Sequence, residues 1–149
     1  MRSDMSSSDL SPPAPAEHAA SGLVSVPSRH TAAQTLERLE AVLKQKGIRL
    51  FARIDHAATA VEAGLSLRTT TVLLFGNPQV GTPLMQSQQT TGIDLPLKAL
   101  VWEDEAGRTW LTYNDPRYLA ERHQVRDHTE TVQAMTAALQ ALARAATGP

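Results

Sequence analysis

Hydrophobic positions recur along this chain with a helical period in some segments and with strict alternation in others. After Thr31, one helical face carries four apolar residues: Leu36, Leu39, Val42 and Leu43. Thr31 and Gln34 have the spacing of a capping box, and Gly47 is a suitable helix end. The pattern therefore predicts a helix from about Thr31 to Gly47.

Strand-like segments surround this helix. They span residues 22–27, 48–55, 69–75, 97–104 and 108–114. In the second of these, four apolar residues alternate with polar ones and predict one buried face: Ile48, Leu50, Ala52 and Ile54. The turn at 104–107 predicts a hairpin that places Trp102 opposite Trp110.

Shorter helices are predicted between and after the strands. One spans 57–63, one begins at the cap-and-proline pair Thr82-Pro83 and ends near Gly92, and one follows Asp115-Pro116 through His123. A last apolar stripe contains Val125, His128, Val132, Met135, Leu139 and Leu142. We expect it to pack on the domain's own sheet, with docking on a partner subunit as the alternative.

This order predicts an α+β fold, with a mostly antiparallel curved sheet, a long helix after the first strand and helices at the C-terminus. Residues 1–21 are rich in Ser, Pro and Ala and are expected to be a disordered tail. The α+β domain is expected at 22–127, and a C-terminal amphipathic helix at 128–146. Without an apolar leader or span, a cytoplasmic location is the default expectation, with no membrane contact.

Composition narrows the function classes. The formal net charge of the 149 residues is -1, and residues 22–149 carry 13 basic and 12 acidic side chains. A near-neutral domain lacks the electrostatic footprint of a nucleic-acid binder. The chain contains no cysteine, which excludes disulfides, thiolate metal sites and thiol nucleophiles. We expect no cofactor.

The segment from Gly76 to Thr82 resembles a phosphate-binding loop in its glycine spacing, but it lacks the chemistry of one. Thr82 stands where the lysine should be, and Pro83 replaces the hydroxyl residue that binds magnesium. A turn that leads into a capped helix is the favoured interpretation. A weaker hypothesis is a small anionic ligand at the N–H groups of Thr82, Leu84 and Met85.

Asp55-His56 is a possible acid–base pair, although adjacent strand residues point to opposite faces unless the strand breaks there. A capping role for Asp55 is the structural alternative. His123 and His128 are too far apart around a helix to share a metal ion, so no metal site is predicted.

Seven segments in order resemble the domain-of-unknown-function 302 family of bacteria and archaea. They are Asp55-His56, Gly64-Leu65-Ser66-Leu67-Arg68, Leu73-Leu74-Phe75-Gly76-Asn77-Pro78, Gly81-Thr82-Pro83-Leu84-Met85, Asp94-Leu95-Pro96-Leu97-Lys98, Val101-Trp102-Glu103-Asp104 and Tyr113-Asn114-Asp115-Pro116-Arg117-Tyr118. One departure is Thr69, where relatives often have proline. The resemblance implies a compact α+β fold with strands curved around a long helix, and often a dimer. It implies no reaction and no catalytic residue.

Two functions from different classes follow as hypotheses. The leading one is a non-enzymatic, homodimeric module that binds a small molecule or a protein partner. The alternative is an enzyme that uses Asp55, His56 or Asp115 for acid–base chemistry on a small polar substrate. The candidate ligand-binding residues are Asp55, His56, Asn77, Gly81, Thr82, Asn114 and Asp115, and the catalytic residues are unknown.

Overall fold

The structure is a computed structural model that describes residues 21–149. The tail predicted for residues 1–21 lies outside the described residues, except for Ser21.

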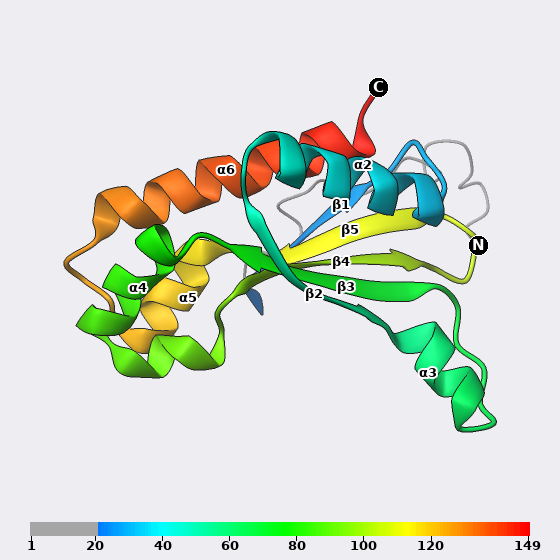
Figure 1. The fold of residues 1–149 in the computed structure, drawn as a ribbon, viewed down its shortest axis with the longest axis horizontal. Helices are drawn as coiled ribbons and strands as arrows, with labels where there is room; N and C mark the ends of the chain where they lie inside the picture. The colour runs from blue at the N-terminus through cyan, green and yellow to red at the C-terminus, as the bar shows by residue number, and fades with distance from the viewer. Residues whose placement is uncertain (1–20) are drawn as a thin grey trace, which may run out of the picture.

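A five-stranded antiparallel sheet forms the centre of the molecule (Figure 1). Its strands are β1 (Leu23–Pro27), β2 (Arg49–Asp55), β3 (Thr70–Gly76), β4 (Leu97–Glu103) and β5 (Thr109–Asn114). They lie in the order β1-β5-β4-β3-β2, and each pairs antiparallel with its neighbours. The helical segments are α2 (Ala32–Gln45), α3 (His56–Glu62), α4 (Pro78–Ser87), the 3-10 helix η3 (Gln89–Ile93), α5 (Pro116–His123) and α6 (Thr129–Thr147). This architecture confirms the predicted α+β class.

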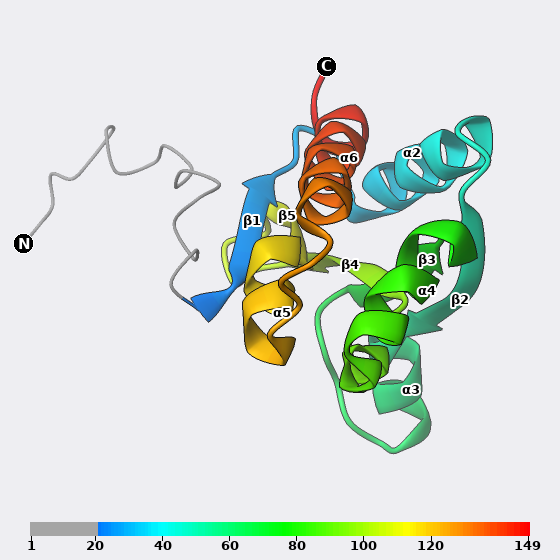
Figure 2. The same ribbon diagram turned by 90° about the vertical axis from the view of Figure 1, so that its left-hand side faces the viewer.

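Two helices cover one face of the sheet and enclose the main core. Figures 1 and 2 show α2 and α6 side by side on that face. The buried side chains there come from both layers and include Leu36, Leu39, Leu43, Leu73, Phe75, Val101, Leu111, Leu139 and Leu142. The capping box predicted for α2 is confirmed, because Thr31 Oγ1 accepts from Gln34 N and Gln34 Oε1 accepts from Thr31 N.

The C-terminal helix packs on its own domain, as its apolar stripe predicts. Leu139 and Leu142 belong to the main core, whereas Val132 and Met135 form a second buried cluster with Leu84 and Val125. His128 does not belong to the helix itself, since it lies at the N-cap position, and Val125 is buried in the preceding loop.

The opposite face of the sheet is left open at its middle. Figure 1 shows α4, η3 and α5 gathered at one end of the sheet, while α3 projects from the other end. None of the residues of α3 is buried.

The predicted hairpin of β4 and β5 is confirmed. Trp102 pairs with Trp110 across the strands, with ring centroids 6.1 Å apart and planes inclined by 20°. The turn closes with Asp104 N donating to the Arg108 carbonyl at 2.9 Å, and Gly107 adopts a φ of 81°. That positive φ favours glycine, because a side chain would clash with its own backbone.

The buried face predicted for the second strand is wrong. Leu50 is 40% exposed and Ile54 is 42% exposed. β2 lies at the edge of the sheet, and its register shifts between Leu50 and Ala52, so the alternation does not keep one face against the core.

Candidate functional site

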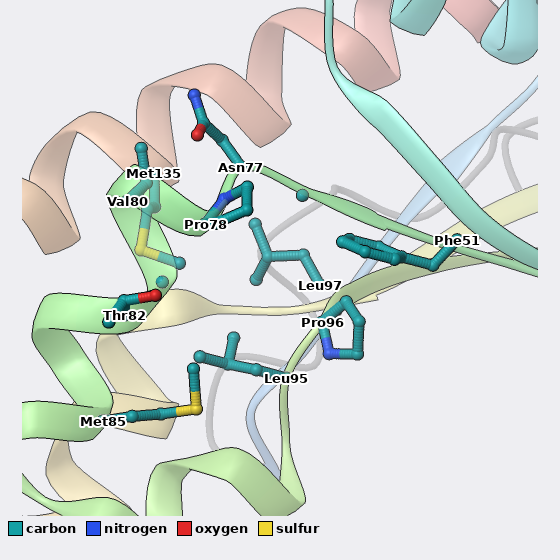
Figure 3. Close-up of a pocket in the computed structure, with 12 residues that line it drawn as sticks. Phe51, Asn77, Pro78, Val80, Thr82, Met85, Leu95, Pro96, Leu97 and Met135 are labelled. Carbon is teal, nitrogen blue, oxygen red and sulfur yellow. The ribbon is translucent and has the colours of Figure 1, made fainter.

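A small apolar pocket lies where β3 turns into α4. We name it the Phe51 pocket, and its volume is about 230 Å³. It is lined by Phe51, Gly76, Asn77, Pro78, Val80, Gly81, Thr82, Met85, Leu95, Pro96, Leu97 and Met135. These residues come from β2, the β3–α4 junction, the segment before β4, and α6 (Figure 3).

The sharp start of α4 shapes this pocket. The side-chain oxygen of Asn77 accepts a hydrogen bond from Gln79 N at 2.9 Å. The backbone carbonyl of Asn77 accepts hydrogen bonds from Val80 N and Gly81 N. Pro78 occupies the first helical position, where a missing N–H costs nothing. The strand can therefore turn directly into the helix.

The helix start predicted at Thr82-Pro83 is wrong, because α4 begins at Pro78 and contains Pro83 in its interior. α4 also ends at Ser87, and the 3-10 helix η3 takes the chain to Ile93. The amides of Thr82, Leu84 and Met85 thus lie beyond the first helical turn, where N–H groups bond to the carbonyl four residues earlier. They are not the free donors that the anion hypothesis required.

The pocket suits an apolar ligand with one polar group. Figure 3 shows the Thr82 hydroxyl directed toward the interior, whereas the Asn77 amide points away from it. Phe51 closes the opposite side and is 43% exposed. The Arg49 guanidinium lies 4.9 Å from the centroid of that ring and holds it by a cation–π contact. Met85 and Met135 add flexible thioethers that can adapt to different ligand shapes.

A second, shallower depression lies on the open face of the sheet. We name it the sheet-face hollow. It has a volume of about 330 Å³ and is lined by Leu23, His56, Val72, Lys98, Leu100, Thr112, Tyr113 and Asn114. The structure thus divides the predicted site residues between two places. Asn77, Gly81 and Thr82 line the Phe51 pocket, while His56 and Asn114 line the sheet-face hollow.

The two candidate aspartates are helix caps. Asp55 Oδ1 accepts from Ala58 N at 2.9 Å, at the start of α3. Asp115 accepts from Arg117 N at 2.9 Å, and its two oxygens also receive Arg117 Nε at 3.1 Å and a terminal guanidinium nitrogen at 2.8 Å. Burial raises the pKa of Asp115, but the hydrogen bonds from Arg117 outweigh burial and lower the pKa overall.

His123 belongs to a network between η3 and α5. Its Nε2 lies 2.6 Å from Asp94 Oδ2, and its Nδ1 lies 2.9 Å from Thr90 Oγ1. Arg122 donates to both oxygens of Asp94 at 3.0 Å. Within residues 21–149, no three side chains of the His, Asp or Glu type are grouped so that they could hold a metal ion.

Sequence reasoning missed most of the residues that line the Phe51 pocket. The sequence places Phe51 in a predicted strand and Met135 on the last apolar stripe, while the side chains of Met85 and Leu95 carry no predicted role. One signal was available, since Phe51 is a large aromatic on the face of β2 that otherwise carries charged residues. Lys98, which lines the sheet-face hollow, carried no such signal.

The fold defines this protein as an antiparallel α+β domain in which α2 and α6 cover one face of the sheet. The family model described as "Domain of unknown function DUF302" matches residues 24–142, so the chain belongs to this family. A solved structure of the uncharacterized conserved protein DUF302 from Bacillus stearothermophilus has a TM-score of 0.76 and 23% identity. The alignment covers 84% of this chain and 98% of that one, and this likeness concerns the fold.

Three curated relatives from Brucella are more similar in sequence. "Fluoride-specific ion channel FluC 1" of Brucella suis biovar 1 (strain 1330) is 55% identical over 105 residues, which are 70% of this chain and 41% of the relative. The proteins of Brucella abortus biovar 1 (strain 9-941) and Brucella melitensis biotype 1 have the same identity, with 39% of each covered. The chain thus spans about two-fifths of the curated relatives it matches. No helix within residues 21–149 is both long enough and apolar enough to cross a membrane.

Proposed function

We propose that this domain is a non-enzymatic module that binds a small, mainly apolar molecule in the Phe51 pocket. The observation that carries the proposal is the pocket itself, which has about 230 Å³ of space, an apolar lining and one inward hydroxyl. Binding sites for small molecules typically combine such a lining with a few polar groups that fix orientation.

The volume limits the size of the ligand. A cavity of about 150 Å³ with an apolar lining accommodates benzene. A pocket of about 230 Å³ therefore fits a single or fused ring with a short substituent. Thr82 Oγ1 would bond the polar atom of that ligand, and Phe51 would stack on its ring.

The engagement of both candidate carboxylates supports a module over an acid–base enzyme. Asp55 caps α3, and Asp115 is held by Arg117 at the start of α5. Neither carboxylate lines the Phe51 pocket or the sheet-face hollow. A cytoplasmic location remains part of the proposal.

Titration with indole tests the proposal. Indole should shift the backbone amide resonances of α4 and of the first residues of β4 in proton–nitrogen NMR spectra. Phe51→Ala should weaken binding roughly tenfold, because it removes the apolar contact of one ring face. Ile93→Ala is the matched control, since Ile93 is 74% exposed and does not line the pocket. Indole shifts spread over the whole surface, or equal affinities in both variants, would contradict the proposal.

We also propose that two copies of the chain associate through α3 and the loop after it. Val61 is 69% exposed and Leu65 is 67% exposed, and none of the residues of α3 is buried. Glu62 and Arg68 flank these apolar side chains in the sequence. In an antiparallel contact about a twofold axis, Glu62 of one copy would lie opposite Arg68 of the other. Val61→Asp should halve the mass measured by light scattering, whereas Ile93→Asp should leave it unchanged. A wild-type chain that is monomeric at all concentrations would exclude this contact.

A second candidate function is favoured by the Brucella relatives. In these proteins, named as fluoride-specific ion channels, the part similar to this chain makes up about two-fifths of the length. The proposal is that the chain acts as an accessory domain that contacts such a channel. It should then co-purify in detergent with the unmatched part of the Brucella suis relative. Failure of the two to associate would exclude this second function.

A further inference from the structure

The sheet-face hollow combines an apolar floor with polar groups at its rim. Val72, Leu100 and Thr112 lie in register across the three central strands and form the floor. His56 from α3, Lys98 from β4 and Asn114 from β5 supply the rim. His56 lies more than 40 positions before Lys98 in the chain, and Lys98 lies 16 positions before Asn114. The fold brings all three residues to the edge of one depression.

Lys98 gives the sheet-face hollow a positive charge that no acidic lining residue balances. No acidic side chain lines it, and within residues 21–149 no carboxylate lies within ion-pair distance of Lys98. The Lys98 ammonium donates to the carbonyls of Asp94 at 3.0 Å and Pro96 at 2.9 Å, which uses two of its three protons. Lys98 is half-buried, and this burial lowers its pKa, although Asp94 raises it in part.

The remaining polar groups of the rim are available to a ligand. Among the contacts of the described residues, neither the His56 ring nor the Asn114 side-chain amide has a hydrogen-bond partner in the protein. Thr112 Oγ1, in contrast, accepts from Trp102 Nε1 at 2.8 Å and bonds Ser25 Oγ at 2.9 Å. It is therefore part of the framework that holds the floor in place.

We propose that the sheet-face hollow binds a small organic carboxylate with an apolar body. Lys98 would contribute its third proton and its charge, and the amide of Asn114 would donate to the carboxylate oxygens, while His56, at the α3 end of the hollow, would contact the far end of the ligand. Val72 and Leu100 would contact the apolar body.

This site is separate from the Phe51 pocket. The two share no lining residue. Leu97 lines the Phe51 pocket and its neighbour Lys98 lines the hollow, because adjacent strand residues point to opposite faces of the sheet. Either proposal can therefore fail without the other.

The experiment compares two probes with the same apolar body, one ending in a charged carboxylate and the other in a neutral amide. Titration of the full chain with 3-phenylpropionate should shift the amide resonances of Val72, Leu100 and Thr112 in proton–nitrogen NMR spectra. Its neutral amide, 3-phenylpropanamide, should bind about tenfold more weakly, because a charge-assisted hydrogen bond is lost. This comparison needs no variant and so does not depend on how a substitution affects folding.

Single substitutions then test whether the polar residues at the rim of the hollow bind 3-phenylpropionate. Lys98→Met and Asn114→Ala should each weaken binding of 3-phenylpropionate severalfold, whereas Lys44→Met, which removes a lysine from α2, and Phe51→Ala should not. Equal affinity for the acid and the amide, no shifts at millimolar acid, or shifts confined to α4 would each overturn the proposal. The last of these results would instead assign the acid to the Phe51 pocket.

Discussion

Single carboxylates fix several of the turns in this fold, and Asp104 shows how. Its Oδ1 accepts from the backbone N–H groups of Ala106 and Arg108, both at 2.9 Å, and its Oδ2 accepts from Trp110 Nε1 at 2.9 Å. One side chain thus holds the hairpin turn and orients one member of the tryptophan pair. The hydrogen bond from Trp110 is the largest cause that lowers the pKa of Asp104, followed by the one from Arg108 N.

The lowered pKa predicts how Asp104 contributes to stability as pH changes. Because the folded state favours the carboxylate, the contribution is fully present above the unfolded-state pKa of about 3.9 and is lost as pH falls through the folded-state pKa. Asp104→Ala should therefore lower Tm more at pH 7 than at pH 2.5 to 3, as measured by circular dichroism. Glu105→Ala, at an exposed neighbouring position, is the control. Equal losses at both pH values would contradict the prediction.

Local residue patterns predicted the caps well but could not choose between competing ones. Asp55 and Asp115 cap helices as their positions indicated. At α4, however, Asn77-Pro78 and Thr82-Pro83 both have a capping residue before a proline, and the first pair starts the helix. Once the helix has begun at Pro78, Pro83 falls within it, at a position that the sequence pattern alone marks as a start.

At the scale of elements, polar contacts join η3 to α5 and support one wall of the Phe51 pocket. Asp94 receives the His123 ring and the Arg122 guanidinium, and Leu95 and Pro96 of the pocket follow it directly. The side chain of His123 is 7% exposed, so its ring nitrogens depend on these protein partners. Thr90 of η3 binds the other nitrogen of that ring.

Loss of Asp94 should therefore destabilise this end of the molecule. Asp94→Ala leaves a ring nitrogen of His123 buried without its partner, which costs about 1–3 kcal/mol. Hydrogen exchange of the η3 amides should accelerate accordingly. Glu121→Ala breaks an exposed ion pair with Arg126 and should cost about 0–1 kcal/mol. If Asp94→Ala and Glu121→Ala lower the free energy of unfolding equally, the contacts of Asp94 with His123 and Arg122 do not contribute to stability.

The periodicity of β2 shows what an alternating pattern leaves open. Alternation correctly predicted the strand, but it does not say which layer, if any, covers each face. Here the apolar side chains of Ala52 and Ile54 lie on the face that has no helical layer, whereas Arg53 pairs with Glu40 of α2 on the covered face. The bulge at Phe51 then turns that ring toward the pocket, which sequence alone could not reveal.

At the scale of the whole molecule, the sequence predicted the elements and their class, but the site depends on their arrangement. The strand order β1-β5-β4-β3-β2 places β1 beside β5, a pairing that no local pattern specifies. The Phe51 pocket likewise joins residues 51, 82, 95 and 135, which are far apart in the chain. Such sites arise from packing, so apolar residues that line them look like ordinary core residues in the sequence.

The same arrangement predicts a conflict between stability and binding at Gly81. This glycine lies inside α4 and lines the pocket, and a Cβ added there would be 3.5 Å from Leu95 Cδ1, an ordinary contact. Gly81→Ala should therefore stabilise the fold by about 0.5–1 kcal/mol, because alanine favours helix over glycine. Its methyl group should also narrow the pocket and weaken indole binding.

Thermal unfolding and indole titration of the same samples test both halves of this prediction. Gly107→Ala is the control, since its φ of 81° penalises alanine by about 1 kcal/mol, while nothing lies within 4 Å of the added Cβ. It should lower Tm and leave indole affinity unchanged. A Gly81→Ala protein with a raised Tm and unaltered indole affinity would show that the Phe51 pocket is a gap in packing. Glycine at position 81 would then not be kept for a ligand.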